Sequence, residues 1–118
     1  MSEIREVNAR IESTNLGVED HGILTVFIYL DYGGTSQGFG GHFLDDYDEK
    51  TNKRTASKAC GLFVKKVLEV VGVENWEDLP GKFVRVKCEH SKIHEIGNII
   101  EDKWFNPSKE LEKLEEND

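Results

Sequence analysis

The chain has 118 residues, which is enough for one domain with its own core and too few for two ordinary domains. Its apolar fraction of 37% is modest, and a small domain buries a limited share of its surface alone, so we expect a homo-oligomer. The net charge of −8 opposes binding to the phosphate backbone of a nucleic-acid duplex.

Two β-strands are predicted in the first third of the chain. Residues 4–13 alternate loosely between apolar and polar, and the polar segment 15–22, with two glycines, predicts a loop. Residues 23–32 (ILTVFIYLDY) alternate strongly and carry apolar side chains on both faces. This pattern is typical of a central strand.

Five glycines lie between Gly33 and Gly41. Two interpretations remain open: the second strand of a hairpin over residues 37–44, favoured by His42, Phe43 and Leu44, or a flexible loop. The spacing is not GxGxxG and no helix follows, which excludes a dinucleotide-binding turn. A tight turn or bulge packed on a neighbouring strand is the simpler explanation of these glycines, and a close approach to a ligand is the alternative. The segment 45–55 is predicted to be a charged, exposed loop.

The clearest helix covers residues 56–71, where Cys60, Phe63, Val64, Val67, Leu68 and Val71 form one apolar stripe. Thr55 is the predicted N-cap and Gly72 the glycine after the last turn. A capped turn at 75–79 and a type II turn at Pro80-Gly81 precede strands over 82–88 and 93–100.

The order of elements predicts an α+β fold: a small antiparallel or mixed β-sheet with one main helix packed across it. We assign residues 1–107 to a single globular domain. Residues 108–118 are expected to form a short acidic tail, helical or frayed.

Residues 82–88 carry the most informative surface pattern. Period-two alternation places Phe83, Arg85 and Lys87 on one face, opposite Val84, Val86 and Cys88. A ring beside two cations suits a ligand that has both a base and a phosphate. An amphipathic edge strand with Phe83 covered by the tail explains the pattern equally well. Arg54, just before the helix, adds positive charge near an anion-favouring helix N-terminus.

Metal and catalytic patterns are weak. Cys88, His90 and His94 form C-x-H-x3-H, but a structural zinc site needs four ligands, so we interpret the histidines as a surface pair. His21 after Glu19-Asp20 could be a polarised base, although turn chemistry explains it better. We therefore predict no metal, no cofactor and no enzymatic activity.

Two cysteines and the apolar pattern bear on location. Cys60 and Cys88 fall in a predicted helix and a predicted strand, and are expected to be free buried thiols. No run approaches the length of a membrane span, and MSEIREVNAR lacks an apolar stretch, so we expect a cytoplasmic protein.

Four segments together resemble a known family: LGVEDHGILTVFIYLDYGG (16–34), SQGFGGHFLD (36–45), GVENWEDLPGKFVRVK (72–87) and IHEIGNIIEDKWFNP (93–107). The chain is similar to the first-described type of phage-encoded Thoeris anti-defence proteins. The resemblance implies a sponge that sequesters a cyclised ADP-ribose signal without cleaving it. It also implies an oligomer built from dimers, in which some members hold cyclic oligonucleotides at other subunit junctions.

The resemblance also implies site residues. Phe83 is expected to stack on a base, and Arg54 and Arg85 to bind phosphate, with further contacts from Gln37, Phe39, Asn98 and Lys103. Two other hypotheses remain. A phage inhibitor that binds a host defence protein, such as an anti-CRISPR, would use the acidic surface as a nucleic-acid mimic. A nucleotide hydrolase would need a catalytic cluster that the sequence does not indicate.

Overall fold

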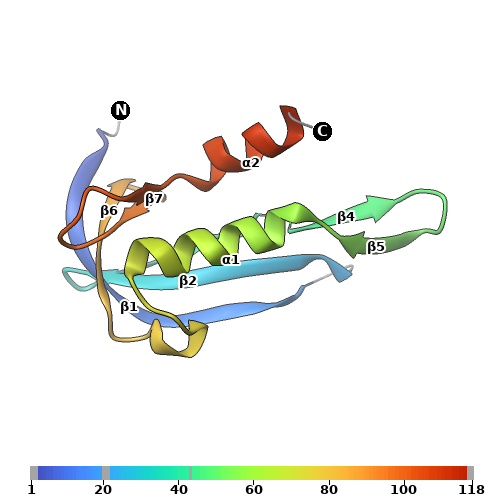
Figure 1. Ribbon diagram of the computed structural model, residues 1–118. Coiled ribbons are helices and arrows are strands. Elements are labelled where there is room, and N and C mark those ends of the chain that lie inside the picture. The colour runs from blue at the N-terminus through green and yellow to red at the C-terminus, as the bar shows by residue number, and fades with distance from the viewer. Residues whose placement is uncertain (1–2, 20–21, 43, 117–118) are drawn as a thin grey trace.

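Six strands form one antiparallel sheet in the order β3-β2-β1-β6-β7-β8, and two short strands form a second sheet (Figure 1). The structure is a computed structural model and describes residues 3–19, 22–42 and 44–116. The elements are β1 (Arg5–Val18), β2 (Leu24–Tyr32), β3 (Thr35–Gly40), β4 (Asp45–Asp48), β5 (Lys53–Ala56), α1 (Lys58–Val71), the 3-10 helix η2 (Trp76–Asp78), β6 (Phe83–Glu89), β7 (Lys92–Gly97), β8 (Trp104–Phe105) and α2 (Pro107–Glu116). The predicted α+β class is confirmed.

The large sheet is curved and encloses the core on one face. β3, at one edge, comes into contact with β7, four places along the strand order, so the sheet cannot be flat. The helix α1 lies across the sheet (Figure 1) and buries Phe63, Val67 and Val70. The ring of Phe63 packs between Phe39 of β3 and Phe105 of β8, with centroids 6.1 and 5.2 Å away. These three rings join the sheet edges and the helix into one core.

Both ends of α1 can be explained from single residues. The predicted N-cap Thr55 is wrong, because β5 continues through Thr55 to Ala56 and the helix starts only at Lys58. Ser57 is the N-cap: its hydroxyl accepts a hydrogen bond from the Ala59 amide at 3.2 Å and donates one to the Leu44 carbonyl at 2.9 Å. The prediction for Gly72 is confirmed, since it adopts φ 88° and its amide bonds to the Leu68 carbonyl.

The segment 45–55, predicted to be an exposed loop, instead forms most of the β4–β5 hairpin. Polar contacts hold it together: the Arg54 guanidinium binds the Asp45 carboxylate at 2.7 Å, and the Tyr47 hydroxyl donates to Asn52 at 2.9 Å. The sequence does not alternate between apolar and polar here, so hydrophobic periodicity gives no sign of these strands.

Two other predicted boundaries change. β1 continues to Val18, through part of the predicted loop, after a register shift between Ile11 and Ser13. β7 stops at Gly97 rather than at residue 100, because the Asn98 side-chain oxygen accepts the amides of Ile100 and Glu101 and turns the chain away from the sheet.

The glycine segment forms a hairpin, as one of the two interpretations predicted, although its second strand ends at Gly40. Gly33 and Gly34 have φ of 71° and 82°, which suits a two-residue turn with positive φ at both positions. At Gly40, with φ 122°, an added Cβ would lie 2.3 Å from the Val26 carbonyl oxygen. The predicted type II turn at Pro80-Gly81 is also present, with Gly81 at φ 91° and the Lys82 amide bonded to the Leu79 carbonyl. The predicted strand residue Phe43 lies outside the described residues.

Candidate ligand-binding site

The candidate site begins with the alternation of β6. Val84, Val86 and Cys88 are fully buried in the core, so Phe83, Arg85 and Lys87 face the convex side of the sheet, as predicted. Phe83 is 58% exposed, and its neighbour across the strand pair, Arg10 of β1, is exposed too. A phenyl ring this open to solvent is available for stacking and does not support the core.

Trp104 of β8 lies next to these side chains on the same face. It is paired with Gly97 of β7, and its ring lies so close that a Cβ on Gly97 would be 2.5 Å from it. The Arg85 guanidinium carbon and the Lys87 ammonium nitrogen lie 4.7 and 4.2 Å from the indole ring. Both distances fit cation–π contacts. Sequence reasoning missed Trp104; the only signal was its place in the DKWF segment.

Arg85 uses every nitrogen of its guanidinium group within the chain. Nε and Nη2 each donate at 2.8 Å to the backbone carbonyls of Asn98 and Glu101, and Nη1 lies 3.4 Å from a Glu6 carboxylate oxygen. Asn98 also donates from its side chain to the Val70 carbonyl at 2.8 Å. The two residues therefore hold the 98–103 loop against the sheet and the end of α1.

Four of the predicted site residues come together at this end of the sheet. Arg85 and Asn98 shape the 98–103 loop, Lys103 ends it in an exposed ion pair with Glu101 at 3.1 Å, and Phe83 lies two residues before Arg85 on β6. We call Phe83, Arg85, Lys87 and Trp104, with this loop, the convex-face cluster.

The other three predicted residues lie elsewhere. Phe39 is 1% exposed and belongs to the core, so we do not carry it into a ligand site. Gln37 accepts a hydrogen bond from the Tyr32 hydroxyl. Arg54 lies on β5, in the hairpin at the opposite end of the molecule from β6 (Figure 1). Its Nε and Nη2 bind Asp45, whereas Nη1 has no hydrogen-bond partner among the described residues.

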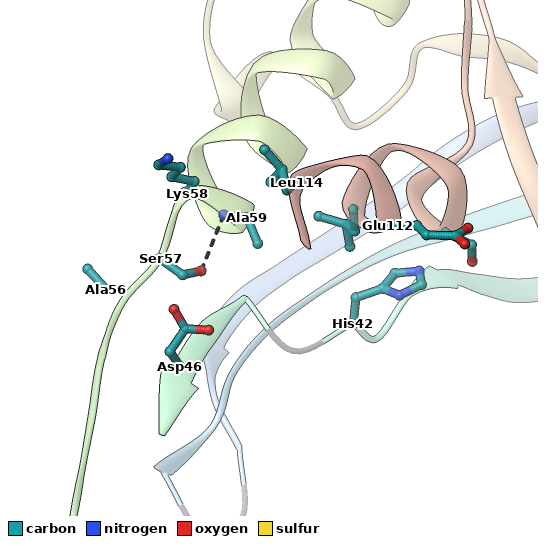
Figure 2. A pocket seen from close by; sticks show the side chains of 10 residues that line it. His42, Asp46, Ala56, Ser57, Lys58, Ala59, Glu112 and Leu114 are labelled. Carbon is teal, nitrogen blue, oxygen red and sulfur yellow. Dashed lines mark hydrogen bonds between the residues drawn. The ribbon is translucent and has the colours of Figure 1, made fainter. Parts of the chain in front are cut away.

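A cavity of about 720 Å³ lies between the start of α1, α2 and the β4–β5 hairpin (Figure 2). Asp46 and Glu112 are in its lining together with His42 and Lys58, and Figure 2 shows Asp46 near Ser57, with His42 and Glu112 across the cavity. Burial first, and then the charge of Lys92, lowers the pKa of His42, which favours its neutral form. The described residues of its lining thus supply two carboxylates and one cation, Lys58, so the cavity does not favour an anion.

The histidine and cysteine pattern forms no metal site in the part of the chain that is described. No group of three His, Cys, Asp or Glu residues within residues 3–19, 22–42 and 44–116 could hold a metal ion. Cys88 is buried, Cys60 is partly buried, and both are free thiols. His94 lies 3.2 Å from a Glu89 carboxylate oxygen. His21 lies outside the described residues.

Comparisons with protein-family models, curated proteins and solved structures gave no match. Within the described residues, no helix is long and apolar enough to cross a membrane. The convex-face cluster and Arg54 are the features of the molecule that bear on its function. Chemically, the cluster offers an exposed ring, a second ring held between backbone and cations, and the positive charges of Lys87 and Lys103. This set can stack on a base, and Lys87 can meet an anion, while the two carboxylates of the loop already bind within it: Glu101 pairs with Lys103, and Asp102 accepts a hydrogen bond from Trp104 Nε1 at 3.0 Å.

Proposed function

We propose that this chain is a phage anti-defence protein that acts in the host cytoplasm by binding a cyclic nucleotide immune signal. The ligand class is a cyclic ADP-ribose isomer or a cyclic oligonucleotide, which is sequestered without being cleaved. The observation that carries the proposal is Phe83, which is 58% exposed on an open sheet face, two and four residues before the cations Arg85 and Lys87 that cover Trp104. Stacking a base on such a ring is worth about 1–3 kcal/mol.

The positions of Phe83 and Arg54 support a site shared by two subunits. The chain is 47 Å along its longest dimension, and the β4–β5 hairpin and β6 lie toward opposite ends of it (Figure 1). A small cyclic nucleotide cannot touch both residues of one chain. Nη1 of Arg54 has no hydrogen-bond partner among the described residues; if it binds a phosphate while Phe83 stacks on the base, the two side chains come from different protomers. We therefore propose a homodimer, or an assembly of dimers.

Arg85 has a different role in this proposal from the phosphate ligand that the resemblance implies. Its guanidinium nitrogens already bind two carbonyls and lie near a carboxylate, so it positions Trp104 and the 98–103 loop on the sheet face that Phe83 shares. Lys87 and Lys103 remain as the cations of the cluster that a phosphate can approach.

The test is to incubate the protein with cyclic ADP-ribose isomers and cyclic oligonucleotides, remove free ligand, heat-denature the protein and analyse the supernatant by chromatography. We expect one of these compounds to be retained and then released unchanged. Release of a linear or hydrolysed product would show an enzyme instead. Retention of none of them at micromolar protein would favour an inhibitor that binds a host protein directly.

A further inference from the structure

A second cavity, of about 470 Å³, lies at the open end of the curved sheet, away from the convex-face cluster. It is enclosed by the first residues of β1, the β2–β3 turn and the β6–β7 turn. Val7 and Tyr32 supply its apolar surface, and Arg5, Thr35 and His90 supply its polar side chains. Asn8 also borders the cavity, but it is paired with Arg85, so its side chain belongs to the convex side of β1. Its volume falls in the range of about 300–1,000 Å³ that small-molecule sites occupy.

The course of β1 explains why an arginine reaches this place. Along its core-facing side, Ile11 and Ala9 are buried, Val7 is partly buried, and Arg5 is exposed. Arg5 is paired with Cys88 and so shares the core-facing side, just beyond the last buried layer. The guanidinium therefore lies at the mouth of the curved sheet.

Tyr32 forms a fixed wall beside Arg5. Its hydroxyl donates to Gln37, which gives this predicted site residue a positioning role here. Burial first, and then the neighbouring Cys88, raises the pKa of Tyr32, while the charge of Arg5 lowers it. The phenol therefore stays protonated at neutral pH, and it lines the same cavity as Arg5.

The charge of the cavity is opposite to that of the whole chain. Arg5 and His90 line it and no carboxylate from the described part of the chain does, although the chain carries a net charge of −8. The acids next to them in sequence face other partners: Glu6 lies 3.4 Å from Arg85, and Glu89 lies 3.2 Å from His94. Arg5 itself has no ion pair or side-chain hydrogen bond with any described residue.

We propose that this cavity binds a small molecule that carries a phosphate on a planar ring system, of the size of a nucleoside monophosphate. Arg5 pairs with the phosphate, His90 and Thr35 supply further hydrogen-bonding groups, and Tyr32 and Val7 contact the ring. This inference does not depend on the proposed sequestration of a cyclic signal, because none of its residues belongs to the convex-face cluster or to the β4–β5 hairpin.

The experiment is an NMR titration of the full-length, ¹⁵N-labelled protein with AMP, adenosine and inorganic phosphate as separate probes. We expect AMP to bind with a dissociation constant of about 0.1–1 mM and to shift the amides of Arg5, Tyr32 and His90. Adenosine and inorganic phosphate are each expected to bind about tenfold more weakly than AMP, since each lacks half of the recognised groups.

The decisive variant is Arg5→Gln, and Arg10→Gln is its matched control. Both arginines lie on β1, but Arg10 is paired with Phe83 and so faces the convex side. Arg5→Gln should weaken AMP binding about tenfold or more, and Arg10→Gln should leave it unchanged. Phe83→Ala should also leave AMP binding unchanged, and Arg5→Gln should leave retention of the cyclic signal unchanged.

Several results would overturn the proposal. They are equal weakening by both arginine variants, AMP-induced shifts that map to Phe83 instead of Arg5, adenosine binding as tightly as AMP, or no saturable AMP binding at about 10 mM. None of these outcomes bears on whether the convex-face cluster retains a cyclic nucleotide, so the two proposals fail separately.

Discussion

Phe83 and Arg85 are adjacent on one face of β6, but they have different roles. Phe83 is exposed and faces away from the core, whereas Arg85 makes two short bonds to backbone carbonyls and covers Trp104. Its side chain is 23% exposed, so these bonds are partly shielded from water. A substitution at Arg85 should therefore lower the stability of the fold, and a substitution at Phe83 should weaken ligand binding.

We predict that Phe83→Ala leaves the free energy of unfolding nearly unchanged and weakens binding of the cyclic ligand roughly ten- to hundredfold, because only a stacking platform is lost. Arg85→Ala should lower the free energy of unfolding by about 2–3 kcal/mol, since two carbonyls lose a charged donor. The free energy of unfolding of Arg85→Lys should lie between those of Arg85→Ala and the wild type, because lysine keeps the positive charge but not the forked donor geometry of the guanidinium group. Urea denaturation and calorimetric titration measure the two effects. If Phe83→Ala unfolds the chain, its role is structural and the site lies elsewhere.

The sequence could predict this site only in part, for a physical reason that Arg85 illustrates. Alternation along β6 is a local property, so the common face of Phe83, Arg85 and Lys87 is predictable. Which acceptors meet the guanidinium depends on where the 98–103 loop returns, and that is set by Asn98 binding the Val70 carbonyl on α1. Arg5 gives no local signal either, because its cavity forms only when β1, the β2–β3 turn and the β6–β7 turn meet.

Among the elements, the β2–β3 hairpin shows how closely backbone packs on backbone in this fold. At Gly40, a side chain would meet the Val26 carbonyl oxygen, and φ is positive. The glycine is thus required by the neighbouring strand and needs no ligand to explain it. Gly61, which is exposed within α1, has free space around it instead: an added Cβ there would have no neighbour within 4 Å.

We predict that Gly40→Ala lowers the free energy of unfolding by about 2–4 kcal/mol, through strained backbone and a clash with β2. Gly61→Ala is the control and should raise the free energy of unfolding by about 0.5–1 kcal/mol, because alanine favours a helix. Chemical denaturation of both variants beside the wild type measures the difference. Equal stability of Gly40→Ala and wild type would mean that β3 is not paired here as described.

Elements with a strong hydrophobic period were predictable, and elements held by polar contacts were not. The central strand and α1 follow from alternation and from an apolar stripe, although packing buries Val70 and leaves Val71 only partly buried. The β4–β5 hairpin depends on the Asp45–Arg54 and Tyr47–Asn52 pairs, which become visible only once the strands are paired. A polar hairpin and a charged loop have the same composition.

At the scale of the whole molecule, the elongated shape decides how a site can be built. The β4–β5 hairpin projects from the end of the molecule that is opposite to β6 and β7 (Figure 1). Arg54 is fixed there by Asp45 in a partly buried pair, so it cannot reach Phe83 of its own chain. A ligand that uses both residues needs two protomers, which links the proposed oligomer to the proposed function.

This link can be tested by mixing two inactive variants. In a dimer, Arg54→Ala and Phe83→Ala each weaken both sites, because every site takes one residue from each protomer, so at a ligand concentration below the dissociation constants of the variants only intact sites bind. A mixed dimer regains one intact site, formed by the Arg54 of the Phe83→Ala chain and the Phe83 of the Arg54→Ala chain.

Co-refolding equal amounts of the two variants should therefore restore about a quarter of the wild-type ligand capacity, because half the molecules are mixed dimers with one site each. Light scattering measures the mass of the assembly, and equilibrium dialysis measures the capacity. Lys65→Ala, an exposed position on α1 outside the proposed site, replaces Arg54→Ala as the control and should bind on its own. A monomeric mass, or a mixture as inactive as its components, would place the whole site within one chain and contradict the shared-site proposal.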